Sequence, residues 1–220
     1  MNTEMNREFD LVIFDWDGTL MDSVAKIVRC FIAAMADANL QPPEESGIRN
    51  IIGLGLMESM AVLMPNSNDQ EKRKVIDLYR DHFLIHDQTE MPFFEGVETG
   101  LLQLQGKGYQ LAVATGKNRA GLDRLLNLHD FEKYFITTRC SDETSSKPDP
   151  QMLNEILAST NVRPDRAVMI GDSTYDMEMA RNADVARIAV SYGAHECDKL
   201  LAYQPRDCLK TFPDVLKWLM

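Results

Sequence analysis

The sequence lacks an excess of basic residues, and this shortage limits the partners that the chain can bind. Its 23 lysines and arginines are outnumbered by 34 aspartates and glutamates, which gives a formal net charge of −11. A basic patch that could outweigh this negative field is not evident in the sequence. We therefore expect no nucleic-acid partner and no anionic membrane surface, and an anionic substrate would need a locally positive pocket.

Long apolar runs and paired cysteines are also missing. No stretch approaches the roughly 20 apolar residues of a membrane span, and the first ten residues lack the basic start and apolar stretch of an export signal. The four cysteines form no C-x-x-C pair in this chain of 220 residues, and we expect them to be reduced and mostly buried. These absences favour a cytoplasmic protein.

The chain does contain a short apolar run that ends at two acids. Leu11–Phe14 is followed by Asp15 and Asp17, which is typical of a buried parallel strand with acids at its carboxyl end. Ligands of open α/β sheets bind at that end. Side chains alternate along a strand, so the two carboxylates are expected to point the same way and to repel each other. Acids at this position can instead simply cap the next helix, and more residues are needed to decide.

The order of the elements predicts two parts. Residues 21–90 show only helical patterns, including a charged helix from Asp69 to His86, whereas strands and helices alternate from Val97 onwards, with helices expected at 119–129 and 174–182. Repeated strand–helix units imply a parallel sheet covered on both faces. We predict a Rossmann-like, doubly wound α/β core domain formed by residues 1–20 and 91–220. An all-helical cap domain, residues 21–90, is inserted into it.

Carboxylates at two strand ends predict a metal site. Asp172 ends a later predicted strand, and Asp176 follows it by one helical turn. Strand ends of one parallel sheet face one crevice, so these acids are expected beside Asp15 and Asp17. Hard oxygen ligands with room for a substrate phosphate suit Mg²⁺. We expect Asp15, Asp172 and the backbone carbonyl of Asp17 to bind Mg²⁺, and Asp176 to hold the ligand shell.

A second group of residues suits a phosphate dianion. The hydroxyl of Thr115, the backbone N–H of Gly116 and the cation of Lys147 are the donors that such a group needs. Asp15 would then attack phosphorus and form an aspartyl phosphate. Asp17 would protonate the leaving alkoxide and later deprotonate water, while Thr115 and Lys147 would stabilise the transferring group.

These motifs, in this order, resemble those of the haloacid dehalogenase superfamily, in its phosphatase branch. They are Asp-x-Asp-Gly-Thr-Leu from Asp15, a strand-end Thr115, an isolated Lys147 before proline, and Gly-Asp-Ser-x-x-Asp around Asp172. The resemblance implies that Asp15 is the nucleophile, Asp17 the acid/base, Thr115 and Lys147 phosphate ligands, and Asp172 a metal ligand. The inserted helices resemble the cap of the phosphoglycolate phosphatase-like subfamily. A Mg²⁺-dependent phosphatase acting on a small phosphorylated metabolite is therefore implied, with 2-phosphoglycolate as one candidate.

Several residues can each be interpreted in two ways. Arg49, four residues before Gly53, resembles a substrate-contacting stretch of related caps, but it can also be an ordinary surface arginine. Lys117 and Arg119 either steer an anion or simply open a helix. His195 either borders the pocket or lies in an exposed loop.

The sequence departs from the family pattern at two positions. Gly116 stands where relatives often have Asn, and Asp184 stands where they often have Gly, in a turn that can require positive φ.

Alternatives to the phosphatase stay open. A phosphosugar mutase of the same superfamily would share the motifs. A non-enzymatic phosphoaspartate switch would also use an acid, a threonine and a lysine at strand ends. We expect a monomer or a homodimer.

Overall fold

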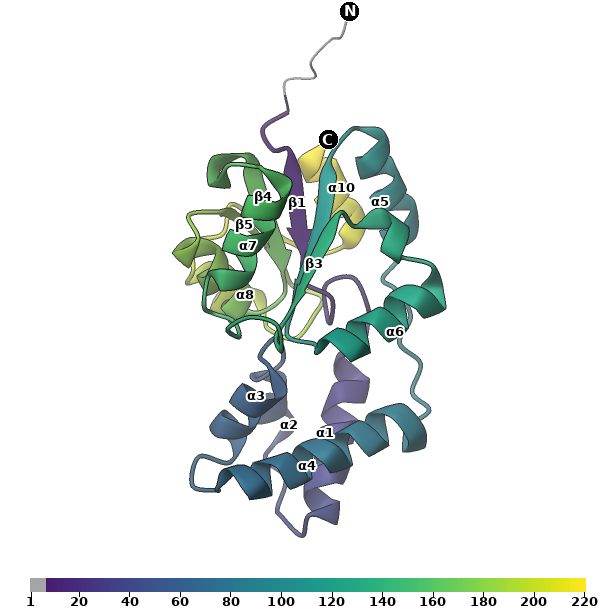
Figure 1. Ribbon diagram of the computed structural model, residues 1–220, viewed down its shortest axis with the longest axis vertical. Coiled ribbons are helices and arrows are strands. Elements are labelled where there is room, and N and C mark those ends of the chain that lie inside the picture. The colour runs from purple at the N-terminus through teal and green to yellow at the C-terminus, as the bar shows by residue number, and fades with distance from the viewer. Residues whose placement is uncertain (1–6) are drawn as a thin grey trace, which may run out of the picture.

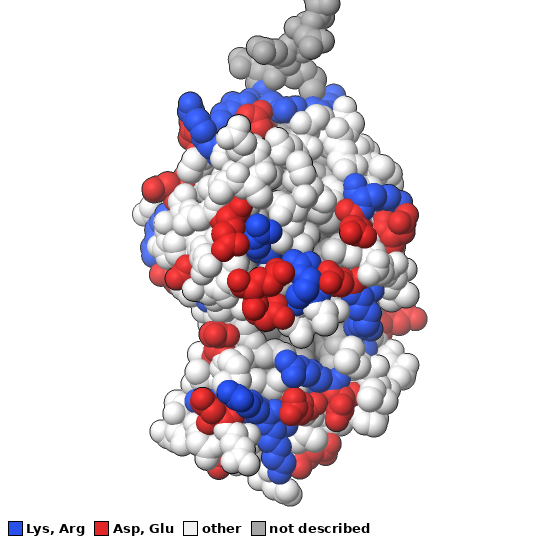
Figure 2. All heavy atoms as spheres, viewed as in Figure 1, with Lys and Arg blue, Asp and Glu red and all other residues white. Residues whose placement is uncertain are grey.

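The computed structural model describes residues 7–220 as a sheet with helices on both faces and a smaller helical lobe beside it (Figure 1). Of the ten N-terminal residues in which no export signal is expected, residues 1–6 lie outside the described part. Among the described residues, no helix is long and apolar enough to cross a membrane. On the face shown in Figure 2, acidic and basic side chains are interspersed, and the molecule narrows between the two lobes.

The sheet confirms the predicted doubly wound α/β architecture. Its six strands are all parallel and lie in the order β3-β2-β1-β4-β5-β6. Their bounds are Leu11–Phe14 for β1, Gln110–Thr115 for β2, Thr137–Cys140 for β3, Ala167–Gly171 for β4, Ala186–Val190 for β5 and Cys208–Leu209 for β6. The chain winds outward from β1 on one side and from β4 on the other. The crevice at the carboxyl ends of β1 and β4 is therefore the switch point at which such sheets bind ligands.

Alternating side chains of β1 explain how helices cover both faces of the sheet. The core helices are α5 (Val97–Gly106), α6 (Arg119–His129), α7 (Gln151–Thr160), α8 (Thr174–Asn182), α9 (Cys197–Leu201) and α10 (Phe212–Leu219), with the short turns η2 (Glu132–Tyr134) and η3 (Pro164–Arg166). Val12 and Phe14 pack with α5, α6 and α10, while Leu11 and Ile13 pack with α7 and α8. The bounds predicted for α6 and α8 are confirmed.

The smaller lobe follows β1 directly. It contains α1 (Val24–Asp37), α2 (Glu45–Arg49), α3 (Leu56–Leu63), α4 (Asp69–Asp81) and η1, one turn of π-helix (His82–His86). Apolar residues of these helices form a buried cluster of their own, which Ala194 of the core joins. This separate cluster fits the predicted division into a cap and a core, and the exact domain limits stay a prediction. We refer to residues 21–90 as the cap below.

The segment between α2 and α3 lies directly against the core. Gly55 N–H donates to Ser146 Oγ at 2.9 Å, and the Tyr175 hydroxyl donates to the Asn50 carbonyl at 2.9 Å. These bonds come from the loop after β3 and from α8, both of which also supply site residues. The cap is therefore anchored on the same loops that build the crevice.

One expectation about the cysteines is wrong. Cys197, at the start of α9, and Cys208, in β6, form a disulfide with a Cα–Cα distance of 6.4 Å. The two residues do not form a C-x-x-C motif, so the sequence does not indicate the pair. The packing of α9 beside β6 brings them together. Cys30 and Cys140 are free and buried, and burial raises the pKa of their thiols to about 11 and about 12.

Candidate active site

Three buried carboxylates meet at the carboxyl ends of β1 and β4. Asp15 directly follows β1, Asp172 directly follows β4, and Asp176 lies in the first turn of α8. One oxygen from each of the three side chains lies within 4.8 Å of the others. The predicted convergence of these acids is thus what the fold produces, because β1 and β4 are neighbours in the sheet.

Lys147 lies among these carboxylates. It comes from the loop between β3 and α7, and its Nζ lies 2.9 Å from Asp15 Oδ1 and 2.6 Å from Asp176 Oδ1. Burial by itself would lower the pKa of Lys147, but the charges of Asp15 and Asp176 outweigh burial and raise it. The ammonium group therefore stays charged and holds Asp15 in place.

The acids of the cluster outnumber its cation. Burial, followed by the charges of the neighbouring acids, raises the pKa of Asp15 well above its usual range, against the opposing effect of Lys147. Burial and the nearby charge of Asp176 raise the pKa of Asp172 to about 7. Asp15 Oδ2 is buried and has no hydrogen-bond partner among residues 7–220. An unpaired carboxylate oxygen in an acidic, all-oxygen site fits a hard divalent cation.

Hydrogen bonds fix the orientation of the two acids after β4. Thr19 Oγ1 donates to Asp172 Oδ1 at 2.9 Å, and the backbone N–H of Ala194 donates to Asp172 Oδ2 at 2.6 Å. Asp176 Oδ2 accepts from Ser173 N and Ser173 Oγ at 3.0 and 2.6 Å. The first of these bonds, together with the bond from Asp176 N to Ser173 Oγ at 3.3 Å, forms a capping box at the start of α8. Asp176 is therefore already bound on both oxygens, whereas Asp15 Oδ2 has no partner among residues 7–220.

Gly18 explains why the motif after β1 contains glycine. Its φ is +76°, and a Cβ atom there would lie 2.1 Å from Asp172 Oδ2. The strand ends at Phe14, so both Asp15 and Asp17 lie beyond it, and both residues line the same cavity. That their side chains point the same way stays a prediction.

Asp17 has partners of its own. Its Oδ1 accepts from Ser23 Oγ at 2.5 Å, and its Oδ2 lies 2.9 Å from Lys117 Nζ. Within residues 7–220, its carboxylate is not part of the three-acid cluster. Its predicted roles as acid/base and as a metal ligand through the backbone carbonyl stay predictions.

Thr115 and Gly116 lie where β2 ends, beside the acids. Thr115 is fully buried, and its Oγ1 accepts from the backbone N–H of Lys117 at 3.2 Å. A Cβ atom at Gly116 would lie 2.5 Å from the Gly53 carbonyl oxygen and 2.6 Å from that of Leu54. The backbone of the cap therefore rests on Gly116, which gives a steric reason for the departure from Asn at this position.

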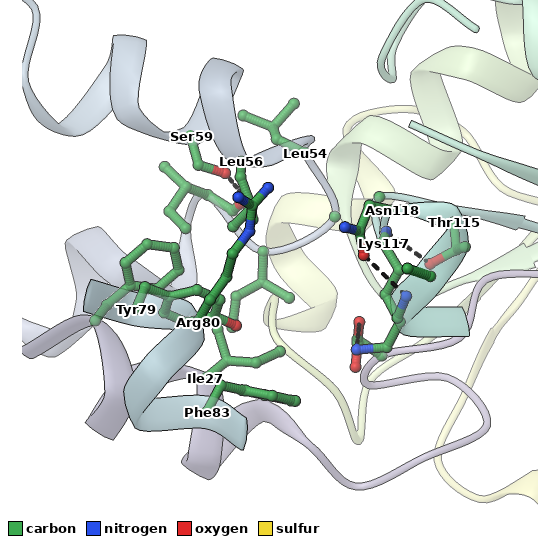
Figure 3. Close-up of a pocket in the computed structure, with 18 of the residues that line it drawn as sticks. Ile27, Leu54, Leu56, Ser59, Tyr79, Arg80, Phe83, Thr115, Lys117 and Asn118 are labelled. Atoms are coloured by element: carbon green, nitrogen blue, oxygen red, sulfur yellow. Dashed lines mark hydrogen bonds and ion pairs between the residues drawn. The ribbon is translucent and has the colours of Figure 1, made fainter. Parts of the chain in front are cut away.

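Residues of both the cap and the core line a cavity of about 350 Å³. Figure 3 shows labelled residues of the two parts facing one another. The core side of its lining includes Asp15, Asp17, Thr115, Gly116 and Lys117. The cap side consists mostly of apolar and aromatic side chains. This arrangement can bind a phosphate group against the core and the rest of an ester against the cap.

Two of the residues left open by the sequence lie outside this lining. Arg49 donates from Nη2 to the Gly193 carbonyl at 2.8 Å and so joins the cap to the core. His195 is 5% exposed, and its Nδ1 accepts from the backbone N–H of Thr174 at 3.0 Å. The expectation of an exposed loop histidine is wrong, and burial lowers the pKa of His195. Substrate contact by Arg49 stays a prediction.

Lys117 and Arg119, the two cations that follow Thr115, have different partners. Lys117 faces Asp17 and lines the cavity, whereas Arg119 pairs with Glu143 at 2.7 Å and with Asp123 at 2.9 Å, away from it. Sequence reasoning treated Lys117 and Arg119 alike. Position along the chain could not distinguish them, because they follow the same strand and differ only in the direction of their side chains.

Comparison with known proteins gives a consistent family. A family model described as haloacid dehalogenase-like hydrolase matches residues 12–190. A protein of Dickeya dadantii named "Probable phosphatase IndB" is 36% identical over 214 residues, which cover 94% of this chain and 91% of that protein. A protein of Psychrobacter arcticus named phosphoglycolate phosphatase is 27% identical over 219 residues, covering 96% and 95%. A crystal structure described as a predicted phosphatase from Clostridium acetobutylicum has a TM-score of 0.85, with 26% identity and coverage of 96% and 97%.

Proposed function

Because this chain belongs to the haloacid dehalogenase-like hydrolases, we propose that it is a Mg²⁺-dependent phosphatase that hydrolyses a small phosphate monoester through an aspartyl-phosphate intermediate. The observation that carries the proposal is the buried Oδ2 of Asp15, which has no hydrogen-bond partner within residues 7–220, on a residue that lines a cavity large enough for an ester. The names of the relatives support phosphate-ester hydrolysis. The name of the Psychrobacter arcticus relative makes 2-phosphoglycolate one candidate substrate.

The proposed reaction uses residues at the core end of the cavity together with the buried Lys147. Asp15 attacks phosphorus while the ester P–O bond breaks, and Asp17 gives its proton to the leaving oxygen. Asp17 then takes a proton from water, which attacks the aspartyl phosphate and releases inorganic phosphate and free Asp15. The hydroxyl of Thr115, the backbone N–H of Gly116 and the ammonium of Lys147 bind the phosphoryl oxygens.

The acidic cluster is the proposed cation site. Asp15 and Asp172, with the backbone carbonyl of Asp17, would hold Mg²⁺, and Asp176 would position the site through Lys147 and Ser173. When bound, Mg²⁺ supplies positive charge that offsets the charge of the nucleophile and of the phosphoryl oxygens. The Lys147 ammonium alone leaves the cluster with an excess of negative charge, and this imbalance supports a divalent ion.

Two alternatives share the same nucleophile. A phosphosugar mutase would also form an aspartyl phosphate but would return the phosphoryl group to the sugar. A phosphoaspartate switch would need no cavity, yet one of about 350 Å³ borders Asp15. The phosphatase is preferred because both relatives described above carry that name. A cytoplasmic location, a monomeric or homodimeric state and a small phosphorylated metabolite as partner belong to the same proposal.

The test is phosphate release from a panel of phosphate monoesters, with Mg²⁺ or with a chelator. We expect release that requires the metal and that Asp15→Asn abolishes, with a circular dichroism spectrum and melting temperature close to those of the wild type. Retained turnover in Asp15→Asn would contradict the nucleophile. Phosphosugar isomerisation without net phosphate release would favour the mutase.

A further inference from the structure

The two ends of the cavity differ in chemistry. The core end carries the carboxylates of Asp15 and Asp17, the hydroxyl of Thr115 and the ammonium of Lys117. The cap end includes Ile27 of α1, Leu56 of α3, Tyr79 of α4, and Phe83 and Leu84 of η1, and Figure 3 shows the first four facing the core residues Thr115, Lys117 and Asn118 across the cavity. A phosphate bound at the core end would therefore direct the rest of its ester toward an apolar surface.

The aromatic members of this surface form one packed wall. The rings of Phe31 and Tyr79 are stacked, with centroids 4.2 Å apart, and those of Tyr79 and Phe83 lie 5.6 Å apart. The Nζ of Lys117, which binds Asp17, lies 5.2 Å from the centroid of the Phe83 ring. The wall thus begins next to the residue that is proposed to protonate the leaving group. Rigid aromatic surfaces of this kind bind planar or branched apolar groups at little cost in side-chain entropy.

The size of the cavity also favours an ester whose leaving group is larger than two carbons. A cavity of about 350 Å³ falls in the range of about 300–1,000 Å³ that is typical of pockets for drug-sized ligands. A phosphate with a two-carbon leaving group would occupy only the core end. The cap end of the cavity would then hold no part of the substrate, and the gain from packing apolar atoms against its apolar lining would be lost.

Charge argues against a small anionic leaving group. The carboxylate of a glycolate would lie close to the phosphate, where Asp15 and Asp17 already add negative charge. Three cations line the cavity. Lys117 is paired with Asp17 at 2.9 Å, and Arg80, on the cap side, has its Nη1 3.3 Å from Asp77 Oδ1. A glycolate carboxylate would therefore compete with the ion pairs of Lys117 and Arg80, and the third cation, Arg124 of α6, is an exposed side chain.

We propose that the preferred substrate is a phosphate monoester of an apolar alcohol or phenol, whose aryl or branched alkyl body packs on the wall formed by Phe31, Tyr79 and Phe83. This inference rests on the proposed phosphatase function and narrows its substrate class. It disfavours 2-phosphoglycolate as the preferred substrate.

The first experiment measures binding without turnover. Methyl-, propyl-, benzyl- and naphthylmethylphosphonate, which lack the ester bond, are titrated calorimetrically into the protein in the presence of Mg²⁺. Each added buried methylene is expected to tighten binding about fourfold. Equal affinity along the series would overturn the proposal.

The second experiment compares turnover. We expect kcat/KM for 1-naphthyl phosphate to exceed that for 2-phosphoglycolate by at least about tenfold, since an apolar pocket gains roughly this factor for a few buried carbons. A preference for 2-phosphoglycolate would overturn the inference and leave the phosphatase intact. If no ester is hydrolysed, the proposed phosphatase fails, and the phosphonate series still measures the apolar site separately.

Two neighbouring residues of η1 provide a matched pair of variants. Leu84 and Ile85 are 55% and 61% exposed, so neither substitution is expected to disturb the fold, and of the two it is Leu84 that lines the cavity. Leu84→Asn should lower the ratio of kcat/KM for 1-naphthyl phosphate over ethyl phosphate several-fold. Ile85→Asn should leave that ratio at the wild-type value. Equal effects of both substitutions would contradict a substrate body lying on this surface.

Discussion

Lys117 Nζ lies 2.9 Å from Asp17 Oδ2 in a partly enclosed ion pair, each side chain being about one-tenth exposed. The other oxygen of Asp17 accepts from Ser23 Oγ. The carboxylate proposed as the acid/base is therefore held by one residue after β2 and by one residue before α1. An acid/base group needs this kind of fixed position, because proton transfer requires hydrogen-bond distance to the reacting oxygen.

We expect Lys117→Met to lower kcat by about tenfold to a hundredfold, a part of the 10²–10⁴ that a positioned acid/base contributes. The reason is that Asp17 loses the partner that fixes Oδ2. Arg119→Met is the matched control, since Arg119 lies two residues on and pairs with Glu143 and Asp123 instead. Initial rates of phosphate release measure both variants. Similar losses of kcat in both would show that Lys117 has no special position.

Much of the site could be predicted because parallel strands end on one side of a sheet. Asp15, Thr115 and Asp172 each follow or end a strand with a recognisable apolar run, and the order of the strands brings them together. Asp184, expected in a turn with positive φ, has a φ of +56°. Lys147 comes from a loop without periodicity, and only its charge and its motif indicate that it belongs to the site.

Other features depend on contacts between elements that no local pattern encodes. The ion pair of Lys117 and the disulfide between Cys197 and Cys208 arise only when separate elements pack. The two-residue strand β6 is too short to show alternation. Tyr79 and Phe83 stand at helical spacing in the sequence, and this pattern indicates burial but not that both residues line a cavity.

Removing the cation at the centre of the acidic cluster should destabilise the protein. Lys147 is fully buried between Asp15 and Asp176, and breaking a buried ion pair from one side costs about 3–5 kcal/mol. We expect Lys147→Met to lower the free energy of unfolding of the metal-free protein by about this amount in urea titrations. Mg²⁺ should recover part of the loss, because it balances the remaining carboxylates. A loss that Mg²⁺ leaves unchanged would contradict a cation site at these acids.

Metal binding should depend on pH around neutrality. Burial raises the pKa of Asp172 to about 7, whereas its ordinary value is 3.8. The folded, metal-free protein therefore binds a proton more tightly than the unfolded chain, so this carboxyl stabilises the fold at low pH and the stabilisation is lost as the pH rises through about 7.

Mg²⁺ must displace that proton, so its apparent affinity should fall at least about tenfold per pH unit below the pKa of Asp172, and more steeply where Asp15, whose pKa is also raised, binds a proton as well. Calorimetric titrations of chelator-treated protein between about pH 6 and pH 8 measure this dependence. The rise in melting temperature on adding Mg²⁺ should likewise be larger at about pH 8 than at about pH 6. An affinity that does not change over this range would show that no proton is displaced from the cluster.

A second pH effect concerns Asp10, which precedes β1 at the end of the strands opposite the site. Arg166 donates to both oxygens of Asp10 at 2.9 Å, and this bonding, together with Arg7, lowers the pKa of Asp10 below 3.8. A carboxylate with a lowered pKa stabilises the fold above its ordinary pKa, and the stabilisation is lost as the pH falls through the lowered value.

Asp10→Asn should therefore reduce the melting temperature near pH 7, and its difference from the wild type should shrink as the pH falls below about 3.8. Asp165→Asn is the control, because Asp165 forms a more exposed pair with Arg163, and exposed pairs contribute little to stability. Thermal unfolding followed by circular dichroism compares the two variants. A constant difference at all pH values would mean that Asp10 acts through packing and not through its charge.

The contact between Gly116 and the cap gives the last prediction. A Cβ atom at Gly116 would lie 2.5 Å and 2.6 Å from the carbonyl oxygens of Gly53 and Leu54, well inside van der Waals contact. We expect Gly116→Ala to push the segment between α2 and α3 away from the core and to lower kcat/KM by about tenfold or more, because small displacements of a bound substrate are costly. Gly106→Ala, at the end of α5 with nothing within 4 Å of the added atom, is the matched control and should leave kcat/KM unchanged. Steady-state kinetics on the best ester of the panel compares the two. If Gly116→Ala turns over that ester as well as Gly106→Ala does, the close approach of cap and core at this point is not required for catalysis.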